Sequence, residues 1–124
     1  MSKKVFFKPE TINFFSARSR DVICFFTIGL LSNFLTLIML NFGERVEFLF
    51  PILFINTSVS FFVAFGCIDT ADDFKAAVED LDEEEKNSAS GKRLIDTPWI
   101  FFKVILGGIF IITPLLTIYS VISI

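Results

Sequence analysis

Three long uncharged stretches constrain the fold of this chain more than any other feature of its sequence. They are residues 22–42, 48–68 and 104–124. A helix needs roughly 20 apolar residues to cross a hydrocarbon core about 30 Å thick, and each stretch is about that long. Because backbone N–H and C=O groups must pair internally in lipid, such stretches predict helices. We therefore expect an all-α integral membrane protein with three transmembrane helices.

Composition supports this class and excludes most enzymes. Hydrophobic residues make up 53% of the 124 residues, the chain holds 18 phenylalanines, and the mean hydropathy is +0.68. With no histidine and two cysteines, the chain lacks the residues for a His-ligated haem, a Ser-His-Asp triad or a four-ligand zinc site of Cys and His. We expect no catalytic residue, cofactor, metal or nucleic-acid partner.

The charged residues divide the chain into four parts. A basic amphipathic segment at 1–21 is followed by a transmembrane hairpin at 22–68, an acidic loop at 69–97 and a third transmembrane helix at 98–124. The first part predicts a short interfacial helix that binds anionic lipid headgroups through its bases. These five bases are Lys3, Lys4, Lys8, Arg18 and Arg20.

Orientation follows from the bases that flank the spans. The N-terminal segment holds five, the loop of the hairpin holds Arg45 alone, and the acidic loop holds four beside ten acids. Since Lys and Arg favour the cytoplasmic side, we expect the N-terminus and acidic loop to be cytoplasmic and the C-terminus outside. The strongly acidic chain favours a bacterial inner membrane. A eukaryotic organelle membrane is the alternative, because the first 20 residues are base-rich.

Two asparagines lie near the middle of the predicted hairpin. Its loop is short, so residues whose numbers add to about 90 lie at equal depth, and Asn33 and Asn56 meet this condition. An unpaired amide is costly in lipid, which predicts an interhelical contact between them. Asn56, Ser60 and Ala64 recur every four residues and predict a small face for helix packing. The alternative is a polar path or a headgroup site.

The third span combines small residues with a proline. Gly107 and Gly108 predict close helix packing, and Pro114 predicts a kink because proline lacks the N–H that a helix needs. Trp99 and Tyr119 lie near opposite ends of the span, as expected for residues at the two membrane interfaces.

The acidic loop carries an apolar stripe. Phe74, Val78 and Leu81 have the spacing of one helix face, and Thr70 with Asp73 resembles a capping box at its start. We expect a short amphipathic helix whose apolar face and following acids dock a basic cytoplasmic partner. A solvated acidic face is the alternative. The four acids of this docking segment are Asp82, Glu83, Glu84 and Glu85.

The three apolar spans and the absence of catalytic residue types favour a subunit of a membrane complex over a self-contained membrane protein. Three narrow helices bury little by themselves, so we expect a non-catalytic small subunit or scaffold of a larger membrane complex, of the secretion, transport or respiratory type. Its partners would be larger integral membrane proteins or copies of itself. The alternative is a self-contained membrane effector, such as a bacteriocin immunity protein or a holin-like protein. The first span offers no continuous polar stripe, which disfavours a water-filled pore.

Overall fold

The computed structural model describes residues 7–43 and 46–123, and within them it contains helices and no strand. Three helices are long and apolar enough to cross a membrane, which confirms the all-α class with three candidate spans and is compatible with a membrane location. Lys3, Lys4 and Arg45, which support part of the orientation prediction, lie outside the described residues. The elements are α1 (Pro9–Phe42), η1 (Val46–Phe48), α2 (Leu49–Glu79), α3 (Glu83–Asn87), α4 (Ala89–Asp96) and α5 (Trp99–Ile122).

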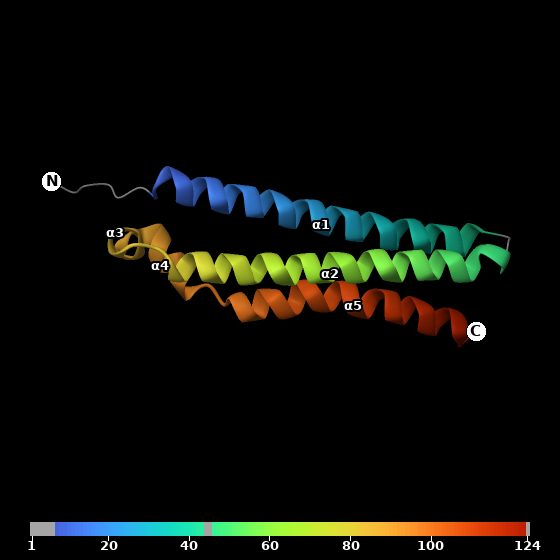
Figure 1. The fold of residues 1–124 in the computed structure, drawn as a ribbon. Helices are drawn as coiled ribbons and strands as arrows, with labels where there is room; N and C mark the ends of the chain where they lie inside the picture. The colour runs from blue at the N-terminus through green and yellow to red at the C-terminus, as the bar shows by residue number, and fades with distance from the viewer. Residues whose placement is uncertain (1–6, 44–45, 124) are drawn as a thin grey trace.

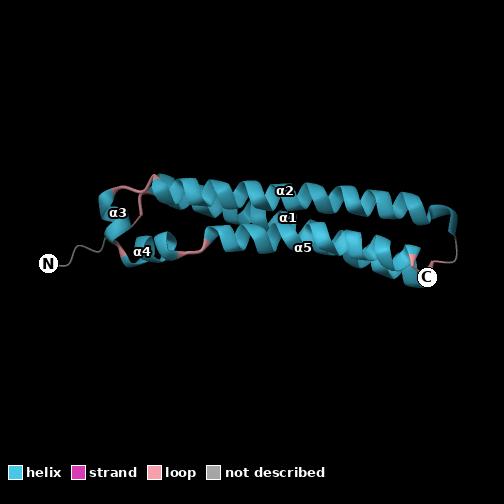
Figure 2. Cartoon of the chain, turned by 90° about the horizontal axis from the view of Figure 1, so that it is seen from below, coloured by secondary structure: helices cyan, strands magenta, loops and turns pink. Residues whose placement is uncertain are grey.

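The long helix α2 is the centre of the bundle. It packs along α1 on one side and along α5 on the other, whereas α1 and α5 contact each other at few points (Figures 1 and 2). The short helices α3 and α4 lie at one end, which we call the charged end. The turn from α1 to α2 lies at the other, the hairpin end, together with the C-terminus of α5.

Two of the helices are longer than the predicted spans. The 34 residues of α1 and 31 residues of α2 extend about 50 Å and about 46 Å at 1.5 Å per residue, more than a hydrocarbon core of about 30 Å. The interfacial helix expected within residues 1–21 is not a separate element, because the chain from Pro9 onward continues into α1. Likewise, residues 69–79 continue α2 and form no separate acidic helix.

The predicted helix start at Thr70 and Asp73 is wrong. Thr70 lies inside α2, where its Oγ1 donates to the carbonyl of Gly66 at 2.8 Å. The capping box lies further on, at the start of α3: Asp82 Oδ1 accepts from Glu85 N at 2.8 Å, and Glu85 Oε1 accepts from Asp82 N at 3.4 Å. Interior N–H groups of α2 already bond to carbonyls four residues earlier, so a cap has no role at Thr70.

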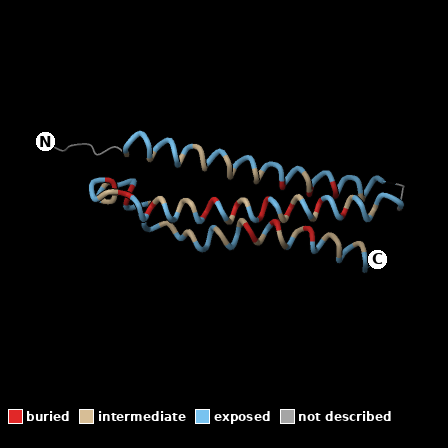
Figure 3. The backbone as a smooth tube through the Cα atoms, in the orientation of Figure 1, coloured by how far each residue is buried: buried red, intermediate tan, exposed pale blue. Residues whose placement is uncertain are grey.

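The core is a narrow seam along α2. Val63, Ala64 and Cys67 from α2 pack with Phe110 from α5, and all four side chains are almost fully buried. Figure 3 shows that burial follows the inward sides of the three long helices, whereas their outward sides are exposed. Large apolar side chains such as Phe54 cover these outward sides, as lipid-facing surfaces require.

Candidate functional site

A cluster of polar side chains joins α1 to α2 in the middle of the hairpin. Asn56 Nδ2 donates to Asn33 Oδ1 at 3.0 Å, so the structure brings the two amides together. Asn33 Nδ2 in turn donates to Ser60 Oγ at 3.0 Å and to the Gly29 carbonyl at 2.8 Å. Ser32 Oγ donates to Asn56 Oδ1 at 2.8 Å. We call Ser32, Asn33, Asn56 and Ser60 the mid-span polar cluster.

The mid-span polar cluster bonds within the hairpin. Asn33, Asn56 and Ser60 are buried, and among the described residues none of their buried side-chain polar atoms lacks a partner. Both amides of the cluster thus bond between helices, which stabilises their packing. Ala64, the third residue of the predicted small face, lies one turn further along α2 in the apolar core. This geometry favours helix packing over a polar path.

Close packing of α5 depends on one of its two adjacent glycines. A Cβ atom on Gly107 would lie 2.7 Å from Cδ1 of Ile68 in α2, so this glycine allows the two helices to approach. Gly108 has no such described neighbour within 4 Å. Pro114 is buried inside α5, which continues through it to Ile122. The kink at Pro114 stays a prediction.

Two further glycines make close contacts that the sequence interpretation missed. A Cβ on Gly29 of α1 would overlap the ring of Phe110 from α5, and a Cβ on Gly66 of α2 would lie 2.8 Å from the ring of Phe25 in α1. Both glycines lie inside apolar helices, where glycine is otherwise unfavourable. That position is the signal that could have identified them.

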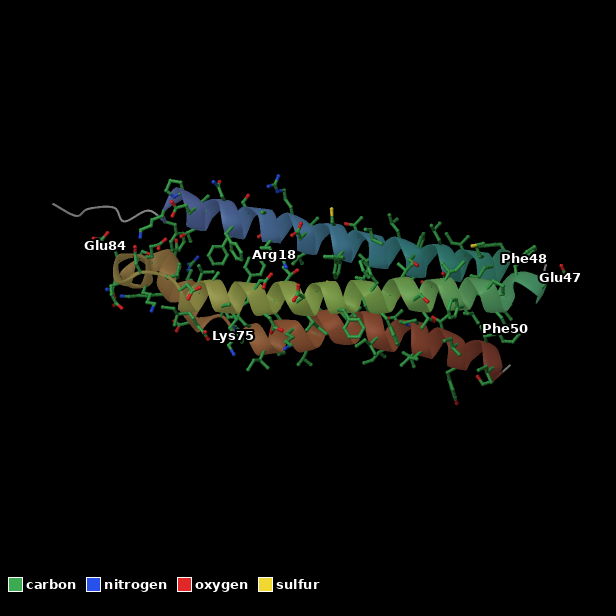
Figure 4. All side chains as sticks on the ribbon, in the orientation of Figure 1. Arg18, Glu47, Phe48, Phe50, Lys75 and Glu84 are labelled. Carbon is green, nitrogen blue, oxygen red and sulfur yellow. The ribbon has the colours of Figure 1, made fainter. Side chains whose placement is uncertain are left out.

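Arg18 forms an ionic cluster at the charged end. Its guanidinium lies 2.6 Å from Asp73, 2.8 Å from Asp21 and 3.7 Å from Asp69, and it donates to Thr70 Oγ1 at 3.2 Å. Figure 4 shows Arg18 between α1 and α2. Acids one turn apart on α2 thus hold the Arg18 guanidinium against the bundle, and lipid binding by the bases of this segment stays a prediction.

Two more ion pairs connect distant segments at this end. Lys103 of α5 lies 3.0 Å from Asp72 of α2. Lys8, which precedes α1, lies 2.7 Å from Asp82 at the start of α3, and its backbone N–H donates to Glu85 Oε2 at 3.2 Å. The hydrogen bond between the two side chains raises the pKa of Lys8 and lowers the pKa of Asp82. The acidic loop is thus partly neutralised by this chain's own bases.

An aromatic stack joins all three long helices at the charged end. The ring of Phe74 in α2 lies between Phe15 of α1 and Trp99 of α5, with both centroid distances 5.4 Å and both pairs stacked. The Trp99 indole N–H donates to the Leu94 carbonyl at 3.1 Å. This stack ties α1, α2 and α5 together, although α1 and α5 contact each other at few points.

The stripe predicted to dock a partner is used inside the protein. Phe74 stacks between two other rings, and Val78 and Leu81 are 6% and 5% exposed. The structure thus packs these three residues against other parts of this chain, and their docking to a partner stays a prediction. Phe74 and Val78 lie in α2, whereas Leu81 follows the end of this helix, and other parts of this same chain cover the apolar side chains.

The four acids of the predicted docking segment have two different roles. Asp82 pairs with Lys8 and Glu85 is buried, and together they form the capping box of α3. Glu83 and Glu84 are exposed, and Glu84 lies at the far tip of the charged end (Figure 4). Only these two acids of the segment stay available for a basic partner.

A large apolar groove opens at the hairpin end. Its volume is about 1090 Å³, and it lies between the last turns of α1, the first turns of α2 and the second half of α5. Three small polar residues of α5, Thr113, Thr117 and Ser120, line it. We call this space the hairpin-end groove. Its apolar lining includes Leu37, Ile38, Met39, Leu40, Phe42, Phe48, Leu49, Ile52, Leu116 and Val121.

Comparison with protein-family models, curated proteins and solved structures finds no match for this chain. Across residues 7–43 and 46–123, no group of three or more Cys, Asp or Glu side chains is arranged to hold a metal ion. Within the bundle, the hairpin-end groove is larger than two cavities of about 310 and 590 Å³ at the charged end.

Proposed function

We propose that this chain is a non-catalytic integral membrane subunit that binds a transmembrane helix of a partner protein in the hairpin-end groove. The groove itself is the observation that carries the proposal. It is lined by the parts of α1, α2 and α5 that belong to the apolar spans, so it lies within the hydrocarbon region if the helices cross a membrane. A helix is the natural protein occupant there, because its backbone is internally bonded.

The size of the groove fits a helix. A helix about 10 Å in diameter with a pitch of 5.4 Å fills about 420 Å³ per turn, so 1090 Å³ corresponds to roughly two and a half turns. The lining from Leu37 of α1 to its C-cap Gly43 is about two turns long. The groove therefore matches one helical segment in both volume and length.

The α5 wall of the groove has the character of a helix-packing face. Thr113, Thr117 and Ser120 are spaced four and three residues apart, so they lie on one side of α5. Small residues at such spacing let a second helix approach closely. The hydroxyls of Thr117 and Ser120 donate to carbonyls of their own helix, at 3.0 and 2.8 Å. Each oxygen can still accept a hydrogen bond from a partner side chain.

The proposal extends to partner and location. The partner is a larger integral membrane protein or a second copy of this chain, and the exposed pair Glu83 and Glu84 offers a second contact for a basic surface outside the membrane. The distribution of bases supports an orientation with the charged end in the cytoplasm. The acidic composition supports a bacterial inner membrane, and a eukaryotic organelle membrane is the alternative.

Site-specific photo-crosslinking tests the proposal. A benzophenone amino acid at Thr117 points into the groove, and the matched control at Ile112 lies on the exposed side of the same helix. In membranes of the host cell, we expect a defined protein adduct from Thr117 and not from Ile112. Adducts of Thr117 with lipid alone would overturn the subunit assignment and favour a self-contained effector.

Filling the groove gives a second readout. The substitution Thr117→Phe places a ring where the partner helix would lie, so we expect recovery of the partner in mild detergent to fall about tenfold. The substitution Ile112→Phe adds the same ring on the exposed side and is expected to change recovery little. Equal recovery from both variants would contradict the proposed binding face.

A further inference from the structure

A second groove runs along α2 and α5 at the charged end. It consists of two adjoining cavities of about 310 and 590 Å³, which share Lys75, Trp99 and Ile100 as lining residues. Figure 4 shows Lys75 on the side of α2 next to the beginning of α5, away from the cluster around Arg18. We call the two cavities together the lysine groove. Neither the mid-span polar cluster nor the hairpin-end groove shares a residue with it.

The charges of the lysine groove are unbalanced. Lys103 is paired with Asp72, whereas Lys75 and Lys86 form no ion pair among the described residues. The remaining acid in the lining is Glu79. The lining therefore carries two ammonium groups and one carboxylate outside ion pairs, so it is net positive in a chain whose net charge is −3. A cavity with this charge attracts an anion.

The opposite part of the lysine groove is apolar and faces outward. Ile100 and Val104 at the beginning of α5 are 66% and 64% exposed, next to the single tryptophan of the chain. Ile100 belongs to the first turn of α5, next to the N-cap Pro98, and the positive end of the helix dipole there also favours an anion. The groove thus places a cationic lining beside an apolar edge, at the end of a span.

We propose that the lysine groove binds one anionic phospholipid, with its phosphate headgroup between Lys75 and Lys86 and an acyl chain along Ile100 and Val104. A tryptophan at the boundary between headgroups and acyl chains is typical of such a position. Charge complementarity favours an anionic headgroup over a zwitterionic one. An acyl chain accounts for the exposed apolar edge, which a small soluble phosphate would leave uncovered.

This inference rests on the proposed membrane location and not on the partner helix. The purified chain in vesicles contains no partner, so failure of the hairpin-end groove as a binding site leaves the lipid site untouched. The lipid site can therefore be tested on the full chain alone.

Fluorescence of Trp99 provides the test, since brominated acyl chains quench a nearby indole. The chain is reconstituted in vesicles that mix brominated phosphatidylglycerol or brominated phosphatidylcholine with unlabelled lipid. Two lysines against one glutamate predict an association about fivefold stronger for the anionic lipid. The double variant Lys75→Gln/Lys86→Gln is expected to lose this preference. The control Lys92→Gln/Arg93→Gln removes two exposed charges of α4 that do not line the groove, and should keep it.

Four other quenching results would contradict the proposed lipid site, the role of the acyl chain or the membrane location. Equal quenching of the wild-type chain by both lipids would overturn the lipid site, and so would equal loss of preference in the control variant. Release of quenching by millimolar inorganic phosphate would contradict the role of the acyl chain. No quenching by either lipid would overturn the membrane location itself.

Discussion

At the scale of single residues, the bundle is specified by a few polar groups in apolar surroundings. Asn56 donates one hydrogen bond to Asn33 across the hairpin, Asn33 donates to Ser60, and Ser32 donates to Asn56. An interhelical hydrogen bond in a membrane contributes about 0.6 kcal/mol on average and up to about 2 kcal/mol. Since apolar side chains slide past each other easily in lipid, such bonds fix the register of α1 against α2.

A double-mutant cycle measures this contact. We expect Asn33→Leu and Asn56→Leu each to lower the free energy of unfolding by about 1 kcal/mol, and the double variant to lower it by less than the sum. Unfolding is followed by circular dichroism during detergent exchange. Asn41→Leu is the control, because exposed Asn41 bonds to the Leu37 carbonyl of its own helix. Strict additivity would refute the coupling between the two amides.

The close contact at Gly29 and the open space at Gly108 predict different stabilities for their alanine variants. Gly29→Ala forces a methyl group against the buried ring of Phe110, which we expect to destabilise the bundle by about 1–3 kcal/mol. Gly108→Ala adds the same methyl group where no described neighbour lies within 4 Å, so little change is expected. The additional change Phe110→Leu should recover part of the loss in Gly29→Ala. Equal stability of the two alanine variants would contradict this packing.

At the scale of single residues, the sequence predicts those contacts that follow from depth in the membrane and from the helix period. The short hairpin loop fixed the relative depth of Asn33 and Asn56, and the structure has them bonded. The partners of Arg18 and Phe74 depended on which faces α1, α2 and α5 turn toward each other. Charge and hydrophobicity patterns carry no such information across distant segments. For that reason, the sequence alone does not predict that Arg18 and Phe74 pair within the protein.

At the scale of elements, the boundaries differ from those expected because charge does not end a helix. The uncharged spans end at charged residues, but helical hydrogen bonds propagate until a breaker or a cap intervenes. No proline interrupts the chain between Pro9 and Phe42, so α1 continues through Arg18 and Arg20. The capping box of Asp82 and Glu85 then starts α3 after α2 has ended.

The contact between Lys8 and Asp82 predicts a pH dependence at this junction. Because the pKa of Asp82 is lowered from 3.8, its contribution is present above that value and is lost as pH falls through the lowered pKa. The raised pKa of Lys8 means that its contribution is lost only as pH rises above 10.5. We expect the NMR titration midpoint of the Asp82 carboxyl to rise toward 3.8 in Lys8→Gln. An unchanged midpoint would show that the contact is absent.

At the scale of the whole molecule, the central position of α2 accounts for both grooves. Because α1 and α5 pack on α2 and contact each other little, they leave open the hairpin-end groove between them. The lysine groove opens along α2 and α5 at the other end, where Lys75 is free of ion pairs among the described residues. One end of the bundle is thus suited to a partner helix and the other to an anionic lipid.

Threading through the membrane is the claim on which the rest depends, and cysteine accessibility tests it most directly. Single cysteines are placed at the exposed positions Asn13, Glu47 and Ser90, in a background with Cys24→Ala and Cys67→Ala. With a membrane-impermeant maleimide, we predict that Glu47 labels in intact cells and that Asn13 and Ser90 label only after the membrane is opened. Labelling of Glu47 and Ser90 from the same side would contradict the three-span bundle.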